Sequence, residues 1–159
     1  MGKKGRNIVK LEISELVEDL NKAFADEWLA FYQYWLSARL VAGPNAASIA
    51  AAFEKAAKDE LEHASELAKR IGELGGTPLL NPKGWFEKAN GAYIEPPDEP
   101  SQWQETVKDA ADAEVGAIEV YERLARKTQK GDVVTNQLLV HILAEEVGHE
   151  EMFENLLLA

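Results

Sequence analysis

Four long stretches of this sequence place apolar residues at alternating steps of three and four, which is the spacing of one buried face of a helix. The helices expected from this pattern cover residues 8–42, 45–74, 101–129 and 133–158. The segment 101–104 also fits a capping box at the start of the third helix. No segment shows the strict apolar and polar alternation of a half-buried strand, so the pattern predicts an all-α protein.

The connections between these helices differ greatly in length, and this difference predicts the topology. Gly43-Pro44 and the segment 130–132 make short turns, which join antiparallel neighbours. Residues 75–100 form a long connection rich in Gly, Pro and Asn, with one short helical turn expected over 85–90. Two helical hairpins joined by one long crossover between helices two and three make a four-helix bundle.

Length and charge narrow the function classes. A chain of 159 residues suits one domain with a sizeable core, so residues 1–159 are expected to form a single domain with a flexible basic tail over 1–7. The 28 acidic and 17 basic residues give a formal net charge of −11, which opposes binding to DNA phosphates. No apolar run is long enough to span a bilayer, and cysteine is absent, so we expect no membrane span and a cytoplasmic location.

Several charged side chains occupy positions inside the apolar stripes, where a bundle normally buries hydrophobic groups. Both hairpins carry the same arrangement: a glutamate, a tyrosine seven residues later, and a Glu-x-x-His segment in the next helix. The residues are Glu27, Tyr34, Glu60 and His63 in the first hairpin, and Glu114, Tyr121, Glu146 and His149 in the second. Residues three or seven apart share one face of a helix, so each set is expected to converge.

The third helix offers more than one glutamate at this level of the bundle. Glu114 lies in the expected buried stripe, whereas Glu122 lies on the same face as Lys108 and Arg126. Glu119 is a further candidate, but the stripe favours Glu114. We therefore take Glu114 as the counterpart of the glutamate in the first helix.

Burying an unpaired carboxylate in a bundle core costs roughly several kcal/mol of free energy, so these charges need neutralising partners. Four carboxylates carry a charge of −4, which two divalent cations would balance. Oxygen ligands with one imidazole per cation suit iron, or manganese, better than structural zinc. One glutamate from each of two helices and Glu-x-x-His from each of the other two is the ligand pattern of di-iron carboxylate bundles. Tyr34 and Tyr121 are then core aromatics, hydrogen-bond donors to carboxylates that bridge the metal ions, or side chains that take part in short-lived radical chemistry.

At these residues the chain resembles the ferritin-like superfamily, in particular bacterioferritin and the Dps-like miniferritins. The likeness covers most of the chain and rests on the segments EWLAFYQYWLSAR, DELEHASELAKRIGELGGTP, AEVGAIEVYERL and LAEEVGHEEMFENL. The resemblance implies a catalytic ferroxidase centre with two iron ions per subunit. Its ligands would be Glu60 and Glu146 as bridges and Glu27, His63, Glu114 and His149 as terminal ligands.

Two departures from bacterioferritin refine this expectation. Leu61 stands where bacterioferritin has a haem-ligating methionine, and the only methionines are Met1 and Met152, so haem is not expected. The chain ends at Ala159, directly after the fourth helix, without the fifth helix of large ferritin cages. The resemblance therefore favours a homo-oligomeric cage of twelve subunits.

The function implied is iron storage and detoxification, in which hydrogen peroxide or dioxygen oxidises Fe(II) at the di-iron centre. Two alternatives stay open. One is a di-metal redox enzyme without a storage role, such as a peroxidase or a manganese catalase. The other is a Dps-like protein that protects DNA through the basic residues Lys3, Lys4, Arg6 and Lys10.

Overall fold

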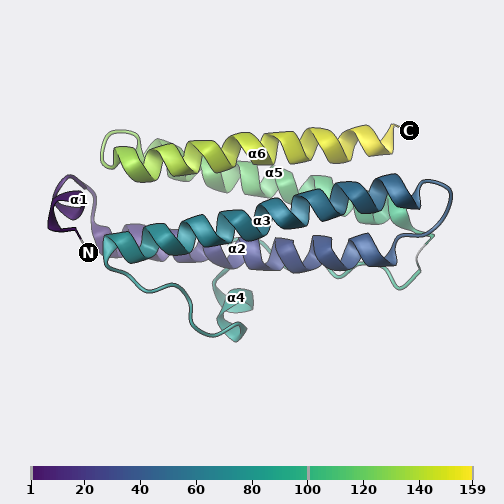
Figure 1. Cartoon of the computed structure of the whole chain (residues 1–159), viewed down its shortest axis with the longest axis horizontal. Coiled ribbons are helices and arrows are strands. Elements are labelled where there is room, and N and C mark those ends of the chain that lie inside the picture. Colours follow the sequence, from purple (N-terminus) through teal and green to yellow (C-terminus); the bar gives the residue numbers. More distant parts are fainter. Residues whose placement is uncertain (1, 100, 159) are drawn as a thin grey trace.

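Four long helices run side by side along the length of the molecule (Figure 1). The structure is a computed structural model that describes residues 2–99 and 101–158. The long helices are α2 (Ile13–Leu40), α3 (Ala46–Leu74), α5 (Trp103–Thr128) and α6 (Val133–Leu157), and the short ones are α1 (Lys3–Asn7) and α4 (Lys83–Lys88). The described residues contain no strand, so the all-α prediction is confirmed.

The packing order of the helices follows the lengths of their connections. α2 packs along α3 and α5 packs along α6, while α3 also contacts α6 and α2 contacts α5. The crossover from α3 to α5 carries α4, which packs on α2 (Figure 1). The four-helix bundle with one long crossover is confirmed. In this order the α2/α5 face and the α3/α6 face lie on opposite sides of the bundle.

Some boundaries differ from the sequence-based expectation. The first long helix begins at Ile13 rather than at residue 8, because the backbone amide of Lys10 donates to the carbonyl of Gly131 and so belongs to a loop contact. Part of the segment expected as a tail forms α1. The capping box at 101–104 is wrong, since α5 begins at Trp103 and Gln102 makes no side-chain cap.

Other local predictions match the structure closely. The second helix ends at Leu74, and Gly75 follows it in the left-handed conformation with φ 94°, which is the expected glycine C-cap. The turn in the crossover is α4, which spans 83–88 instead of 85–90. No helix in the described part of the chain is both long enough and apolar enough to cross a membrane.

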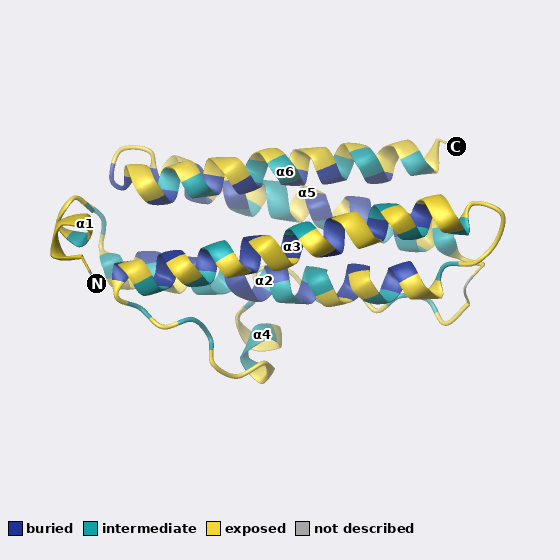
Figure 2. Cartoon of the chain, viewed as in Figure 1, coloured by how far each residue is buried: buried dark blue, intermediate teal, exposed yellow. Residues whose placement is uncertain are grey.

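The apolar core is divided into two clusters along the bundle, and buried positions recur along all four long helices (dark blue in Figure 2). One cluster, which includes Leu20, Leu67 and Leu124, lies towards the α5–α6 turn. The other includes Phe53 and Phe153 and lies towards the α2–α3 turn. The charged residues of the apolar stripes lie between the two clusters.

A buried ion pair fixes the α5–α6 turn against α3. Arg70, which is 7% exposed, donates from Nη2 to both carboxylate oxygens of Asp132 at 2.9 and 3.1 Å, and from Nε to Thr135 Oγ1 at 2.7 Å. Asp132 also caps α6 by accepting from the backbone amides of Val134 and Thr135. Burial alone would raise the pKa of Asp132, but the hydrogen bonds from Thr135 and Arg70 outweigh it and lower the pKa.

Replacing this aspartate is expected to weaken the fold substantially. Asp132→Ala removes the cap of α6 and leaves the buried Arg70 guanidinium with only the half-exposed Glu73 as an ionic partner, so the free energy of unfolding should fall by about 3–5 kcal/mol. Because the folded-state pKa is lowered, the stabilisation is present above the ordinary pKa of an aspartate and is lost as pH falls through the lowered value. Urea denaturation at one fixed protein concentration measures the change.

The matched control is Glu122→Ala, which breaks an exposed ion pair with Arg126 on α5. Exposed pairs of this kind contribute less than about 1 kcal/mol. Equal losses of stability in the two variants would contradict the structural role assigned to Asp132.

Candidate metal centre

The six candidate ligands predicted from the sequence lie close together, between the two apolar clusters. They come from all four long helices, and each has an exposed fraction of 2% or less. The six are Glu27 on α2, Glu60 and His63 on α3, Glu114 on α5, and Glu146 and His149 on α6. Glu119 on the same helix as Glu114 is exposed, as the stripe argument predicted.

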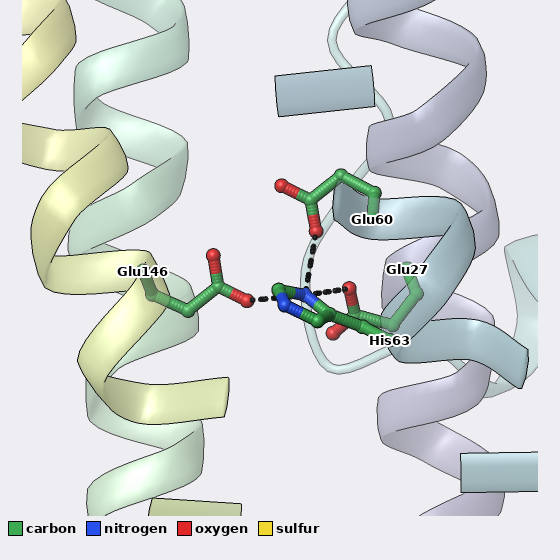
Figure 3. Close-up of side chains that lie close together, drawn as sticks. All are labelled: Glu27, Glu60, His63 and Glu146. Carbon is green, nitrogen blue, oxygen red and sulfur yellow. Dashed lines mark ion pairs between the residues drawn. The ribbon is translucent and has the colours of Figure 1, made fainter. Parts of the chain in front are cut away.

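The six side chains form two groups that could each hold a metal ion. In each group the potential ligand atoms all lie within 4.8 Å of one another. The groups are Glu27, Glu60, His63 and Glu146, drawn in Figure 3, and Glu60, Glu114, Glu146 and His149. Glu60 and Glu146 belong to both groups, which is the arrangement expected of two bridging carboxylates.

The first group surrounds Nδ1 of His63. This atom lies 3.3 Å from Glu27 Oε2, 3.4 Å from Glu60 Oε2 and 3.2 Å from Glu146 Oε1 (Figure 3). Ligand atoms about 2.1 Å from a shared cation, and roughly at right angles around it, lie about 3 Å apart. The spacing of this group therefore matches a metal site.

The second group surrounds Nδ1 of His149 and uses the other oxygens of the shared glutamates. That atom lies 3.3 Å from Glu60 Oε1, 3.1 Å from Glu146 Oε2 and 3.8 Å from Glu114 Oε1. Each shared carboxylate thus turns one oxygen towards each histidine. This is the geometry by which one carboxylate can bridge two cations.

Unsatisfied polar atoms show that the site is suited to cations. Within the described residues four buried atoms of the six side chains lack a hydrogen-bond partner: Glu27 Oε2, Glu60 Oε1, His63 Nδ1 and Glu146 Oε1. Leaving such atoms unpaired is costly, and bound metal ions would satisfy them. The donor set of carboxylate oxygens and imidazole nitrogens suits iron or manganese.

The two tyrosines connect the hairpins across the bundle. Tyr34 on α2 donates to Glu114 Oε1 on α5 at 2.6 Å, and Tyr121 on α5 donates to Glu27 on α2. Both hydroxyls are buried. We expected the tyrosines to donate to the carboxylates shared by both groups, Glu60 and Glu146. They donate instead to Glu114 and Glu27, each of which belongs to only one group.

Two further carboxylates contact the histidines from outside, and the sequence reasoning missed them. Nε2 of His63 lies 2.8 Å from Glu145 Oε2, and Nε2 of His149 lies 3.1 Å from Asp59 Oδ2. Such contacts orient an imidazole so that Nδ1 faces a metal ion. The available signal was the acidic residue that directly precedes each Glu-x-x-His segment.

The close approach of these charges shifts their pKa values in opposite directions. Burial and the nearby Glu60 raise the pKa of Glu27, and burial with Glu60 and Glu146 raises the pKa of Glu114. Burial opposes the charged form of Glu60, but the close approach of the His149 and His63 imidazoles outweighs it and lowers the pKa of Glu60 to about 2.

The two imidazoles hold their protons strongly. Burial lowers the pKa of His149, but the hydrogen bonds to Glu146 and Glu60 dominate and raise it to about 11. The pKa of His63 is raised by the same balance, with Glu146, Glu27 and Glu60 as its partners. Both imidazoles therefore favour their charged form beside these carboxylates.

A cavity of about 430 Å³ reaches the site from the α2/α5 face. Its floor includes four carboxylates of the site, and its walls add Asp26, Asp112 and Glu119. Among the described residues, no lysine, arginine or histidine lines it. One wall is the crossover segment 90–94, which is held by hydrogen bonds from Asn90 and Gly91 to Asp26. This lining attracts cations.

The family model for the ferritin-like domain matches residues 17–158, which contain all four long helices and all six side chains. The chain belongs to the ferritin-like family. The resemblance predicted from the ligand segments and the ferritin-like fold of the bundle are thereby confirmed.

Several ferritin-like relatives are similar over most of their length. Bacterioferritin from Desulfovibrio desulfuricans is 30% identical over 144 residues, which cover 90% of this chain and 74% of that protein. The DNA protection during starvation protein from Pyrococcus furiosus is 32% identical over 149 residues, which cover 92% and 79%. The dodecameric thioferritin from Bacteroides fragilis, a bacterioferritin-related protein, superposes with a TM-score of 0.92 at 37% identity and covers 97% of this chain and 92% of its own.

Binding of a divalent cation to this site is expected to release protons. The raised pKa values of Glu27, Glu114, His63 and His149 mean that these groups keep their protons to higher pH than ordinary side chains, and a cation must displace the protons that they carry. Affinity for Co(II) should therefore rise between about pH 5 and about pH 8. Calorimetric titration in buffers of different ionisation enthalpy counts the protons, and an enthalpy that is independent of the buffer would contradict this charge balance.

Proposed function

We propose that this chain stores and detoxifies iron and that it has ferroxidase activity. The observation that carries the proposal is the pair of buried ligand groups that share Glu60 and Glu146. Two Fe(II) ions are the substrate, one for each group. The ligands are the six residues selected from the sequence: Glu27, Glu60, His63, Glu114, Glu146 and His149.

The reaction takes one electron from each Fe(II) ion. Hydrogen peroxide accepts the two electrons with two protons and yields two water molecules, whereas dioxygen accepts them and yields hydrogen peroxide. The carboxylate-rich ligand set favours the more highly charged Fe(III) product, because anionic oxygen ligands stabilise it by electrostatic attraction. Tyr34 and Tyr121 hold Glu114 and Glu27 in place by hydrogen bonds.

The acidic cavity on the α2/α5 face is the route by which Fe(II) reaches the site in this proposal. The wall carboxylates Asp26, Asp112 and Glu119 attract a hydrated cation towards the floor, where it meets the carboxylates of the site itself. The cavity is also large enough to admit water and a small oxidant such as peroxide.

The storage role requires a hollow particle, and we propose a homo-oligomeric cage of twelve subunits. The similarity to the dodecameric Bacteroides fragilis protein supports this number. Large apolar side chains exposed on α2 and α4, such as Tyr32, Trp35 and Phe86, offer surface for contacts between subunits. DNA protection is not part of the proposal, since the net charge is −11 and the basic side chains of α1 are few.

Removing one shared carboxylate tests the ferroxidase assignment. Glu60→Gln takes a ligand from both groups, so the initial rate of Fe(II) oxidation should fall by at least about tenfold, with a matching loss of Co(II) binding. The rate is followed by absorbance under excess peroxide or dioxygen. Glu122→Gln, an exposed change on α5, is the control and should keep the wild-type rate.

A folded Glu60→Gln variant that oxidised Fe(II) at the wild-type rate would contradict the proposal. Circular dichroism establishes folding in the same samples.

The route through the acidic cavity has a test of its own. Asp112→Asn combined with Glu119→Gln removes two charges from the wall, so the rate at low Fe(II) should fall by up to about tenfold and become less sensitive to salt. Glu151→Gln combined with Glu154→Gln removes the same charge from α6, outside the cavity. Identical rates and salt dependence in the two double variants would rule out this route.

A further inference from the structure

The cavity on the α2/α5 face is larger than iron oxidation by hydrogen peroxide or dioxygen requires. Its volume is about 430 Å³. A water molecule takes up about 30 Å³ in the liquid, and hydrogen peroxide has only one oxygen atom more. Pockets that bind small organic molecules have volumes of about 300–1,000 Å³. The cavity therefore has the volume of a binding site for an organic molecule, and its floor is the metal centre.

The inner surface of the cavity is mainly apolar, although its floor is not. Apolar side chains come from α2, from α5 and from the crossover, among them Leu29, Ala30, Ile94, Ala113, Ala117 and Val120. Small-molecule sites in proteins share this character, because an apolar lining binds the body of the ligand and a few polar groups orient its reactive end. Here the polar groups of the floor are ligands of the candidate metal centre.

The crossover segment that closes one side of the cavity is held in place by α2. Asp26 accepts hydrogen bonds from Asn90 Nδ2 at 2.6 Å and from the backbone amide of Gly91 at 3.0 Å. Seven residues further along the same helix, the buried Gln33 accepts from the backbone amide of Ile94 at 3.3 Å. Both ends of the segment are thus fixed, so binding a ligand does not require a loop to become ordered.

The charge around the cavity limits which organic molecules can enter. Asp26, Asp112 and Glu119 lie in the walls, and within the described part of the chain no basic side chain lines the cavity. Such a site repels an organic anion and accepts a neutral molecule. An organic hydroperoxide, ROOH, is neutral near neutral pH. Its group R matches the apolar walls, and its O–O bond can be reduced by Fe(II).

We propose that this cavity binds a neutral organic hydroperoxide, which the protein reduces to an alcohol with electrons from Fe(II). The group R lies against the apolar walls and the O–O bond faces the floor. One ROOH takes one electron from each of two Fe(II) ions and two protons from solvent. Its O–O bond breaks, and one alcohol ROH, one water molecule and two Fe(III) ions result. This inference rests on the proposed function, since it assigns a further oxidant to the same centre.

Rapid mixing of the full chain with cumene hydroperoxide tests the proposal. The protein is first loaded with two Fe(II) ions per chain in the absence of oxygen, so that entry of iron does not affect the rate. One hydroperoxide should be consumed for every two Fe(II) ions, with 2-phenyl-2-propanol as the product and a rate at least about tenfold above that of Fe(II) in buffer. One-electron cleavage by free iron gives acetophenone instead, and acetophenone as the main product would overturn the proposal.

Gly116→Leu tests whether the hydroperoxide binds in the cavity. Gly116 lines the cavity, and a Cβ atom placed there meets no atom of another segment within 4 Å, so a leucine fits on α5 and narrows the cavity. The rate with cumene hydroperoxide should fall by at least about tenfold, whereas the rate with the much smaller hydrogen peroxide should stay within about twofold of the wild type.

Gly148→Leu is the matched control, because it makes the same change at an open position of α6 outside the cavity. This variant should keep both rates. Equal rates with cumene hydroperoxide in the Gly116→Leu and Gly148→Leu variants would overturn the assignment to this cavity.

The acidic walls allow a test by charge. The para-carboxylate derivative of cumene hydroperoxide carries a negative charge on the same framework, so it should react at least about tenfold more slowly than the neutral compound. Asp112→Asn combined with Glu119→Gln should recover part of this loss, whereas Glu151→Gln combined with Glu154→Gln should not. Equal wild-type rates for the two hydroperoxides would contradict binding between these walls.

The outcomes separate this further oxidant from the proposed function. A wild type that oxidises Fe(II) with hydrogen peroxide or dioxygen, but not with cumene hydroperoxide, would overturn this inference alone. A wild type that oxidises Fe(II) with none of the three would overturn the ferroxidase activity itself.

Discussion

The cost of burying four carboxylates in the middle of a helical bundle determines the organisation of this protein. The apolar core stops on either side of Glu60 and Glu146, so the bundle is stabilised by two separate hydrophobic clusters. Between them, charge has to be balanced by protons or by cations. Burial and the neighbouring carboxylates raise the pKa values of Glu27 and Glu114, which favours protons in this role when no cation is bound.

The same carboxylates also hold the two hairpins together. Glu60 on α3 and Glu146 on α6 face both histidines, and the tyrosines of α2 and α5 donate to the glutamates of the opposite hairpin. At one end of the bundle, the Arg70–Asp132 pair makes a further link between α3 and the start of α6. Polar contacts therefore determine how the hairpins dock, and the apolar clusters supply most of the buried surface.

The two faces of the bundle offer different environments to a cation. The α2/α5 face has an acidic cavity that reaches the carboxylates directly, and the α3/α6 face presents the outer sides of the two histidines. On that second face, the lysine beside Asp59 and the histidine beside Glu145 make the two halves of a nearly symmetric site unequal. The repeated pattern is thus preserved in the six ligand residues, whereas the residues that surround Asp59 and Glu145 differ between the two halves.

The sequence by itself determined the helices and the inward placement of Glu27, Glu60, His63, Glu114, Glu146 and His149. Periodicity assigns each residue to a face of its own helix, and residues three or seven apart share that face in any bundle. The long crossover, the glycine C-cap at Gly75 and the family resemblance could also be predicted, because each depends on residues that are close together along the chain.

Only the tertiary structure decided which side chains touch across helices. Tyr34 contacts Glu114 and not a shared carboxylate, and Glu145 and Asp59 contact the outer nitrogens of the histidines. These pairings depend on how each helix is rotated and shifted against its neighbours, which spacing along one helix does not specify. The acidic cavity is likewise a product of tertiary structure, because its walls come from α2, α5 and the crossover segment, which are distant in sequence.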